Sequence, residues 1–280
     1  MKKIIAAFDG LKFSESTRDY AIFLAKQSHA HLVGVFLDDF TYHSYKIYDL
    51  VREDGQDAGS KQKILEHQDL EMRAVAVHKF ETACRTSGIE FSIHHDRNIA
   101  IQELLHESVY ADLLVINSRE TLTHHNEKLP TKFNRDLLSN AQCPVLLVPH
   151  KFRPINNLVL LFDGEPSSVH AIKMFSYTLY SLKHNPTEVL TVQQVKQSSH
   201  VPDNRLMKEF AKRHFPEAVF TVLKGNPEIE IENYLKKKNE TSLVVLGAYR
   251  RSAVSRWLNQ SMADTLMKDL KVPLFIAHNK

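Results

Sequence analysis

The feature that most limits the fold of this chain is an internal repeat. An apolar run that ends in Phe-Asp-Gly, with a serine five residues after the aspartate, occurs at Ile4–Ser14 and again at Leu158–Ser168, 154 residues later. Two further segments recur in the same order at offsets of 130 and 129 residues: Asp112–Asn117 matches Ser242–Gly247, and Cys143–Pro149 matches Val272–His278. Matches that keep their order predict two tandem copies of one structural unit.

The N-terminal copy carries an extra segment. The offset falls by 24 residues between the first match and the later ones, which places an insertion at about residues 40–61. This segment is rich in aromatic residues and then in acidic ones. Two interpretations stand: a partly helical cover over the edge of a sheet, or a lid or partner surface, since aromatic side chains dominate the energetics of interfaces.

Within each copy, short apolar segments alternate with helical patterns. In the N-terminal copy the expected strands are Ile4–Phe8, His31–Leu37, Ile89–His94, Leu113–Asn117 and Pro144–Val148, and the expected helices are Ser14–Ser28, Gln62–Ser87, Ile99–Tyr110 and Lys132–Asn140. The C-terminal copy repeats this order from Leu158 to Ala277, with a shorter helix at Arg205–His214. Apolar strands that alternate with helices predict a parallel sheet covered on both faces.

The predicted fold class is therefore α/β, with two tandem doubly wound domains that each contain a five-stranded parallel sheet. The length of 280 residues suits two domains. Residues Lys151–Pro154 are polar, end in proline and suit a short linker. We accordingly expect the domains to span residues 1–150, including the insertion, and 151–280.

Glycine is scarce, with eight in the chain, and the eight are not spaced as a dinucleotide fingerprint or a phosphate loop. A backbone that closes on phosphates needs residues without a Cβ atom. The sequence therefore argues against an ordinary Rossmann dehydrogenase, a P-loop NTPase or a protein kinase.

Charge and cysteine content indicate the setting of the protein. The net charge of +3 is too small to indicate a nucleic-acid partner, and the basic run Lys236–Lys238 suits the solvated end of a helix. Cys84 and Cys143 have no motif spacing and suit a reducing compartment. Because the apolar run Ile4–Phe8 is too short for a signal peptide and no stretch is long enough to span a membrane, we expect a cytoplasmic protein.

The Asp-Gly-x-x-x-Ser motif that follows the first strand, the alternation of strands and helices, and the terminal strand Cys143–Pro149 together resemble the universal stress protein family in its tandem form. The resemblance covers nearly the whole chain and implies the adenine nucleotide alpha hydrolase-like fold and a stress-response role. It also implies that the two domains pair through their last strands, Val145–Val148 against Leu274–Ala277, and it leaves room for a homodimer of whole chains.

Family members that bind ATP have the motif G-x2-G-x9-G followed by Ser or Thr after the fourth strand, and an aspartate that ends the first strand and faces the adenosine. In the N-terminal copy the four loop positions hold Asn117, Glu120, Pro130 and Thr131. Glu120 would place a negative charge beside a phosphate, which costs about 1 kcal/mol in water and several in a partly desolvated loop. We therefore expect no ATP binding of the family type here, although Asp9 and Thr131 keep motif positions.

In the C-terminal copy the four positions hold Gly247, Arg250, Gln260 and Ser261. Arginine suits phosphate, but Arg250 and Gln260 bring side chains to positions where the backbone should close. Whether this copy binds ATP is left open. If it does, the alternative function is that of an ATP-binding switch or weak ATPase. Its candidate ligand-binding residues are Asp163, Gly164, Gly247, Arg250 and Ser261.

Structural roles would account for the same residues. Thr131 and Ser261 each precede an expected helix, where a hydroxyl caps free N–H groups. Asp9 and Asp163 each precede glycine, as in a tight turn. Trp257 lies in the second loop, where it either packs the loop or anchors a partner.

The remaining candidates carry little chemistry. His94 and His95 follow the third strand, where they could border the ligand crevice of the N-terminal copy, but adjacent histidines with no further ligand motif do not predict a metal site. No catalytic motif is recognisable. We therefore expect a non-catalytic regulatory or binding protein, with no required cofactor and with an unidentified protein or small molecule as its partner.

Overall fold

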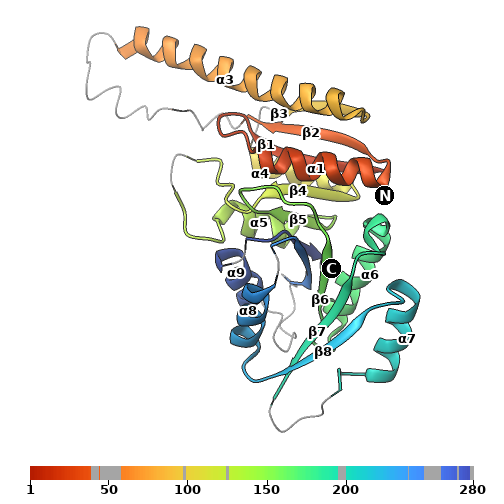
Figure 1. Ribbon diagram of the computed structural model, residues 1–280. Coiled ribbons are helices and arrows are strands. Elements are labelled where there is room, and N and C mark those ends of the chain that lie inside the picture. Colours follow the sequence, from red (N-terminus) through yellow and green to blue (C-terminus); the bar gives the residue numbers. More distant parts are fainter. Residues whose placement is uncertain are drawn as a thin grey trace.

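A computed structural model describes residues 1–38, 44, 58–96, 99–123, 126–194, 200–238, 240–248, 260–269 and 271–277. Its strands are β1 Lys3–Asp9, β2 His31–Leu37, β3 Phe91–Asp96, β4 Leu113–Asn117, β5 Val145–Val148, β6 Asn157–Leu161, β7 Thr187–Gln193, β8 Val219–Lys224, β9 Ser242–Gly247 and β10 Leu274–Ala277. They form one ten-stranded sheet in the order β3-β2-β1-β4-β5-β10-β9-β6-β7-β8 (Figure 1).

Each half of the chain is a five-stranded parallel sheet with the doubly wound strand order. The two halves meet where β5 pairs antiparallel with β10, in the register Leu147 with Leu274 and Val145 with Ile276. The predicted fold class and the predicted pairing of the last strands are both confirmed. Because β5 and β10 pair with each other, a dimer of whole chains through a sheet edge would have to use β3 or β8.

Helices cover both faces of the sheet. They are α1 Glu15–Ser28, α3 Ala58–Ser87, α4 Ala100–Val109, α5 Lys132–Asn140, α6 Pro166–Thr178, α7 Asn204–His214, α8 Pro227–Lys237 and α9 Gln260–Asp269, with the short 3-10 helix η1 at Tyr180–Leu182. Helices α1, α3, α6 and α7 pack on one core, and α4, α5, α8 and α9 on the other. Of the described helices, none is long and apolar enough to cross a bilayer.

Alternate residues of each strand supply the two cores. In β1, Ile4 and Phe8 point into one core and Ile5 into the other, and all are buried. This is why the strands read as continuous apolar runs. Cys84 and Cys143 are buried free thiols, and burial raises the pKa of each to about 12, so both behave as small apolar side chains.

The predicted boundaries differ from the observed ones at two places. Helix α3 begins at Ala58, inside the expected insertion, because its polar first turn has no apolar periodicity to mark it. Strand β3 runs from Phe91 to Asp96, about two residues later than expected. The rest of the insertion, residues 39–43 and 45–57, lies outside the described residues, so its two interpretations stay open.

The basic run Lys236–Lys238 at the C-terminal end of α8 is only partly a solvated helix end. Lys236 pairs with Glu232 on the same helix, but Lys238 Nζ lies 2.7 Å from Oε2 of the buried Glu188 on β7. Glu188 also accepts hydrogen bonds from Thr221 and Tyr234. Burial alone would raise the pKa of Glu188, but the hydrogen bonds and Lys238 hold it below its usual value.

We expect Lys238→Met to lower the free energy of unfolding by about 1–2 kcal/mol at neutral pH, since it removes a partner of a buried carboxylate while Lys238 itself is partly solvated. A carboxyl group with a lowered pKa adds stability above its unfolded pKa and loses it as the pH falls. The deficit of the variant should therefore shrink in acid. Urea unfolding across pH measures it, with Lys237→Met as the control, and equal effects of the two variants would contradict the assignment.

Candidate functional site

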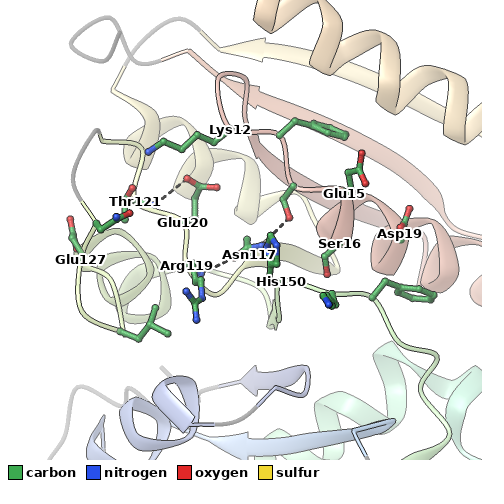
Figure 2. Close-up of a pocket in the computed structure, with 16 residues that line it drawn as sticks. Lys12, Glu15, Ser16, Asp19, Asn117, Arg119, Glu120, Thr121, Glu127 and His150 are labelled. Atoms are coloured by element: carbon green, nitrogen blue, oxygen red, sulfur yellow. Dashed lines mark hydrogen bonds between the residues drawn. The ribbon is translucent and has the colours of Figure 1, made fainter. Parts of the chain in front are cut away.

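A cavity with a volume of about 1180 Å³ lies in the N-terminal half at the carboxyl ends of β1 and β4 (Figure 2). Strand order reverses between β1 and β4, and doubly wound sheets bind ligands at such a switch point. The cavity is lined from three segments of the chain: residues 12–19, 117–129 and 150–152.

One aspartate in each half shapes the turn after the first strand: Asp9 is the last residue of β1, and Asp163 lies two residues beyond the end of β6. Oδ1 of Asp9 accepts a hydrogen bond from the Leu11 amide at 2.8 Å, and Oδ1 of Asp163 accepts one from the Glu165 amide at 2.9 Å. Both aspartates are buried. The turn interpretation is confirmed for one oxygen of each side chain, while a part in ligand binding stays a prediction.

Asn117, at the first glycine position of the family loop, ties β4 to the beginning of α1. Its Nδ2 donates to Ser14 Oγ at 2.9 Å, and its Oδ1 accepts from the Arg119 amide at 2.8 Å. Ser14 is the N-cap of α1 and accepts from the Thr17 amide. A side chain of the protein thus occupies the helix start where a nucleotide phosphate could otherwise approach.

Glu120, at the second glycine position, is 6% exposed. Its Oε1 accepts hydrogen bonds from the backbone amides of Thr121 at 3.0 Å and Leu122 at 3.2 Å, and Leu122 has a left-handed φ of 49°. In Figure 2 the Glu120 carboxylate lies below Lys12, whereas Arg119 points away from it, toward the C-terminal half. Two backbone N–H groups of the loop therefore already donate hydrogen bonds to the Glu120 carboxylate of the same loop.

The pKa of Glu120 is raised to about 7, mainly because the carboxyl group is buried. The negative charge of Asp9 raises it further, while the two amide donors and Lys12 lower it. Lys12 Nζ donates to the Thr123 carbonyl and so also ties the loop to the β1–α1 turn. At neutral pH the Glu120 carboxyl group, which lies close to that of Asp9, is therefore only partly ionised, and it becomes mostly ionised about one pH unit higher.

Thr131 is the N-cap of α5, as the structural interpretation predicted. Its Oγ1 accepts from the Asn134 amide at 3.2 Å and donates to the Glu120 carbonyl at 2.5 Å. Asn134 was missed by the sequence reasoning: fully buried, it donates from Nδ2 to the carbonyls of Asn117 and Ser118 and holds the loop closed. A single asparagine in a short helix gives no sequence signal for such a role.

The segment that joins the two halves also lines the cavity. His150, Lys151 and Phe152 contribute to its wall, although the sequence indicated only a linker there. Phe152 packs on Tyr20 with ring centroids 4.8 Å apart, and Ser16 Oγ donates to the Pro149 carbonyl. These contacts fasten the linker to α1 and fix this wall of the cavity.

In the C-terminal half, backbone geometry accounts for both candidate glycines. Gly164 has φ of +86°, and a Cβ atom there would lie 2.7 Å from Pro202 Cβ. A Cβ atom on Gly247 would lie 2.4 Å from the Ser167 carbonyl oxygen. The end of β9 thus approaches the first turn of α6 too closely for any side chain, so Gly247 by itself is no sign of a ligand.

The other predicted residues of this half are Ser261, Arg250 and Trp257. Ser261 is the second residue of α9, so the expectation that it precedes the helix and caps it is wrong; its side chain is not described. Arg250 and Trp257 lie outside the described residues. Ser168, the counterpart of Ser14, lies inside α6 and donates to the Glu165 carbonyl instead of capping the helix.

The histidines expected to follow the third strand lie inside β3 and do not line the cavity, contrary to expectation. His94 Nδ1 lies 2.5 Å from Glu107 Oε1, and the His95 ring stacks on Phe36 with centroids 6.0 Å apart. Their strand is the outer one of the sheet and lies two strands away from the switch point. In the described part of the chain, no group of three or more His, Cys, Asp or Glu residues is placed to hold a metal ion.

The fold and the cavity at its switch point define a doubly wound α/β protein in which two tandem repeats share one sheet. The sequence profile of the Universal stress protein family matches residues 1–149 and again residues 157–278. The chain therefore belongs to the universal stress protein family and contains two of its domains. No curated protein matches the chain in sequence.

Solved structures share this architecture. A universal stress protein from Archaeoglobus fulgidus DSM 4304 matches with a TM-score of 0.69 at 13% identity, covering 99% of this chain and 96% of that one. A protein from Pseudomonas aeruginosa UCBPP-PA14, described as a universal stress protein, matches with a TM-score of 0.59 at 16% identity, covering 99% and 93%. At such identities the likeness concerns the fold.

A universal stress protein in complex with cAMP also matches, at 18% identity and a TM-score of 0.33, over 46% of this chain and all of that one. Nucleotide binding is a property of that protein. Family membership makes the present chain a stress-response protein.

Proposed function

We propose that this chain, with domains at residues 1–150 and 151–280, is a non-catalytic regulatory or binding protein of the stress response whose N-terminal domain does not take ATP. The observation that carries the proposal is the position of Glu120. Its carboxylate is buried in the loop after β4 and accepts hydrogen bonds from two backbone amides of that loop. The protein's own negative charge thus lies where the family's loop holds phosphates.

Charge repulsion and lost donors both support this. A phosphate oxygen near Glu120 would meet a like charge, which at about 4 Å costs about 4 kcal/mol near a protein surface. It would also find the Thr121 and Leu122 amides already engaged and the first turn of α1 joined to Asn117. Lys12 and Arg119 line the cavity, but they do not replace the missing backbone donors.

The alternative is an ATP-binding switch or weak ATPase in the C-terminal domain. What favours it is that Arg250 stands where the N-terminal domain has Glu120, so this loop lacks the repelling charge. Its candidate residues stay Asp163, Gly164, Gly247, Arg250 and Ser261. Arg250→Glu is the better probe, since a change at Gly247 would disturb the packing of β9 on α6 whatever its effect on ligands.

The test is calorimetric titration of the full chain with ATP in an Arg250→Glu background, which removes the favourable charge from the C-terminal loop. We expect no measurable binding. At pH 8, where Glu120 is mostly ionised, adding Glu120→Gln, which removes one charge and keeps an acceptor oxygen for the amides, should raise the affinity for ATP about tenfold.

Glu127→Gln is the matched control, because Glu127 also lines the cavity but bonds to the Lys132 amide at the start of α5. It should leave the affinity unchanged. Micromolar ATP binding by the Arg250→Glu chain with Glu120 intact would refute the proposal for the N-terminal domain. Loss of ATP binding on going from the natural chain to Arg250→Glu would support the alternative for the C-terminal domain.

A further inference from the structure

A second cavity, of about 680 Å³, lies in the C-terminal domain at the opposite edge of its sheet from Asp163 and Gly164. It opens between the C-terminal ends of α6 and α7, which lie on the same side of the sheet, and the beginnings of β7 and β8 (Figure 1). We call it the α6–α7 groove and define it by Tyr177, Tyr180, Lys183, Arg213, His214 and Val219. None of the residues discussed above for nucleotides belongs to it.

Large side chains gather at the rim of the α6–α7 groove in exposed positions. Tyr177 is 59% exposed, Tyr180 61% and Val219 60%. An aromatic side chain that a partner covers contributes strongly to binding, and tyrosine is among the residues most enriched at the centres of interfaces. Exposure this large also shows that the groove is an open surface, which suits a segment of a macromolecule better than an enclosed small molecule.

Tyr177 is held in place by its neighbours. Its ring lies against the His214 ring, with centroids 5.5 Å apart, and His214 Nδ1 is 2.8 Å from Ser176 Oγ. Burial, with the charge of Lys173, lowers the pKa of His214, so this histidine is neutral at physiological pH. A ring supported in this way loses little conformational freedom when a partner covers it.

The charge around the α6–α7 groove is positive but moderate. Lys183 lies at one side, with Nζ 3.6 Å from the centroid of the Tyr180 ring, and Arg213 lies at the other, in the last turn of α7. Glu217 is the acidic residue among those that line the groove. The carbonyl ends of α6 and α7 add partial negative charge. This balance favours a partner with a few carboxylates over a dense polyanion such as a nucleic acid.

The strand beside the groove offers a backbone template as well. β8 begins at Val219 within the groove and is the last strand of the sheet, paired with β7. The outer side of an edge strand presents N–H and C=O groups that an extended peptide can pair with. Side-chain anchors and a strand edge with which no described strand pairs therefore lie next to each other.

We propose that the α6–α7 groove docks an acidic peptide segment of a partner protein, with carboxylates on Lys183 and Arg213 and an apolar residue against Tyr177. The groove is separate from both nucleotide-type sites, so this inference does not depend on the proposed function. It gives the chain a surface through which a non-catalytic protein can act on others.

The test measures fluorescence anisotropy of a short labelled peptide, rich in glutamate with one central leucine, against the full chain at low ionic strength. We expect micromolar binding that weakens with salt. Tyr177→Ala and Arg213→Glu should each raise Kd about tenfold or more. Because these residues lie on different sides of the groove and are exposed, circular dichroism should show both variants folded.

Tyr110→Ala is the matched control. Tyr110 is 66% exposed in the N-terminal domain, directly after α4, and its ring centroid lies 5.6 Å from that of His106, much as Tyr177 lies against His214. It should leave Kd unchanged.

The proposal would be overturned if the natural chain did not bind the peptide, if Tyr110→Ala weakened binding as much as Tyr177→Ala, or if a peptide with lysine in place of glutamate bound equally well. Tighter binding of a single-stranded oligonucleotide that depends on Arg213 would overturn it too. Self-association that Tyr177→Ala abolishes would also overturn it, in favour of a second copy as the occupant.

Discussion

Gly247→Ala should lower the free energy of unfolding by about 3 kcal/mol, even though it adds a single methyl group. The added Cβ atom would lie 2.4 Å from the Ser167 carbonyl oxygen and 2.6 Å from the carbonyl carbon, both in the backbone of the first turn of α6. Backbone in a packed helix cannot rotate away as a side chain can, so β9 or α6 must move. The variant should therefore lose stability with or without nucleotide.

Urea unfolding followed by circular dichroism measures the effect. Gly59→Ala is the control, because no described atom lies within 4 Å of a Cβ atom at Gly59 and that residue is in the exposed first turn of α3. In a helix this change should be neutral or stabilising, by up to about 1 kcal/mol. If Gly247→Ala unfolded at the same urea concentration as the natural chain, the close approach of β9 to α6 would be wrong.

Glu120→Gln should stabilise the protein by about 2–3 kcal/mol near pH 8 and leave it almost unchanged near pH 4.5. Burial and Asp9 raise the pKa of Glu120 in the folded protein to about 7, above that of an unfolded glutamate. The folded state therefore holds the proton more tightly, and the natural chain loses stability as the pH rises between the two values. Glutamine keeps the acceptor for the loop amides and has no proton to lose.

The measurement is the free energy of unfolding of both chains at several pH values between about 4.5 and 8.5, across the expected titration of Glu120. The difference between them should grow with pH. Glu127→Gln, at the rim of the same cavity, should follow the natural chain across the range. Parallel curves for Glu120→Gln and the natural chain would show that the carboxylate is not strained by burial.

The burial of Glu120 and the packing of Gly247 both affect how an ATP-binding measurement on variants of these residues is interpreted. A buried carboxylate that costs stability is unusual in a core and is more common where its charge serves another purpose. In the proposed function that purpose is to keep polyphosphates out of the N-terminal domain. Gly247, in contrast, holds a position of the family's ligand loop, but its close packing on Ser167 is enough to explain why a glycine is needed there.

The sequence alone determined the α/β class and the duplication, while the pairing of the last strands came from the family resemblance. Strand and helix patterns depend on contacts between near neighbours in the chain, and β1 shows this in the alternation of Ile4 and Ile5 between the two cores. The N-cap at Thr131 is equally local, since its partner is the Asn134 amide three residues on. Because the second copy repeats the pattern of the first, the order of elements in the second domain could be predicted from that in the first.

Only the tertiary structure decided what the loop residues do. Asn117 and Ser14, which bond to each other, are 103 residues apart, and Gly247 is excluded from carrying a side chain by a helix that begins far earlier in the chain. The pKa of Glu120 depends on how deeply it is buried and on Asp9, and neither can be read from local sequence. The α6–α7 groove likewise joins residues of α6, α7 and β8 that share no motif. Short-range patterns specify elements, whereas distances across the fold decide which side chains meet.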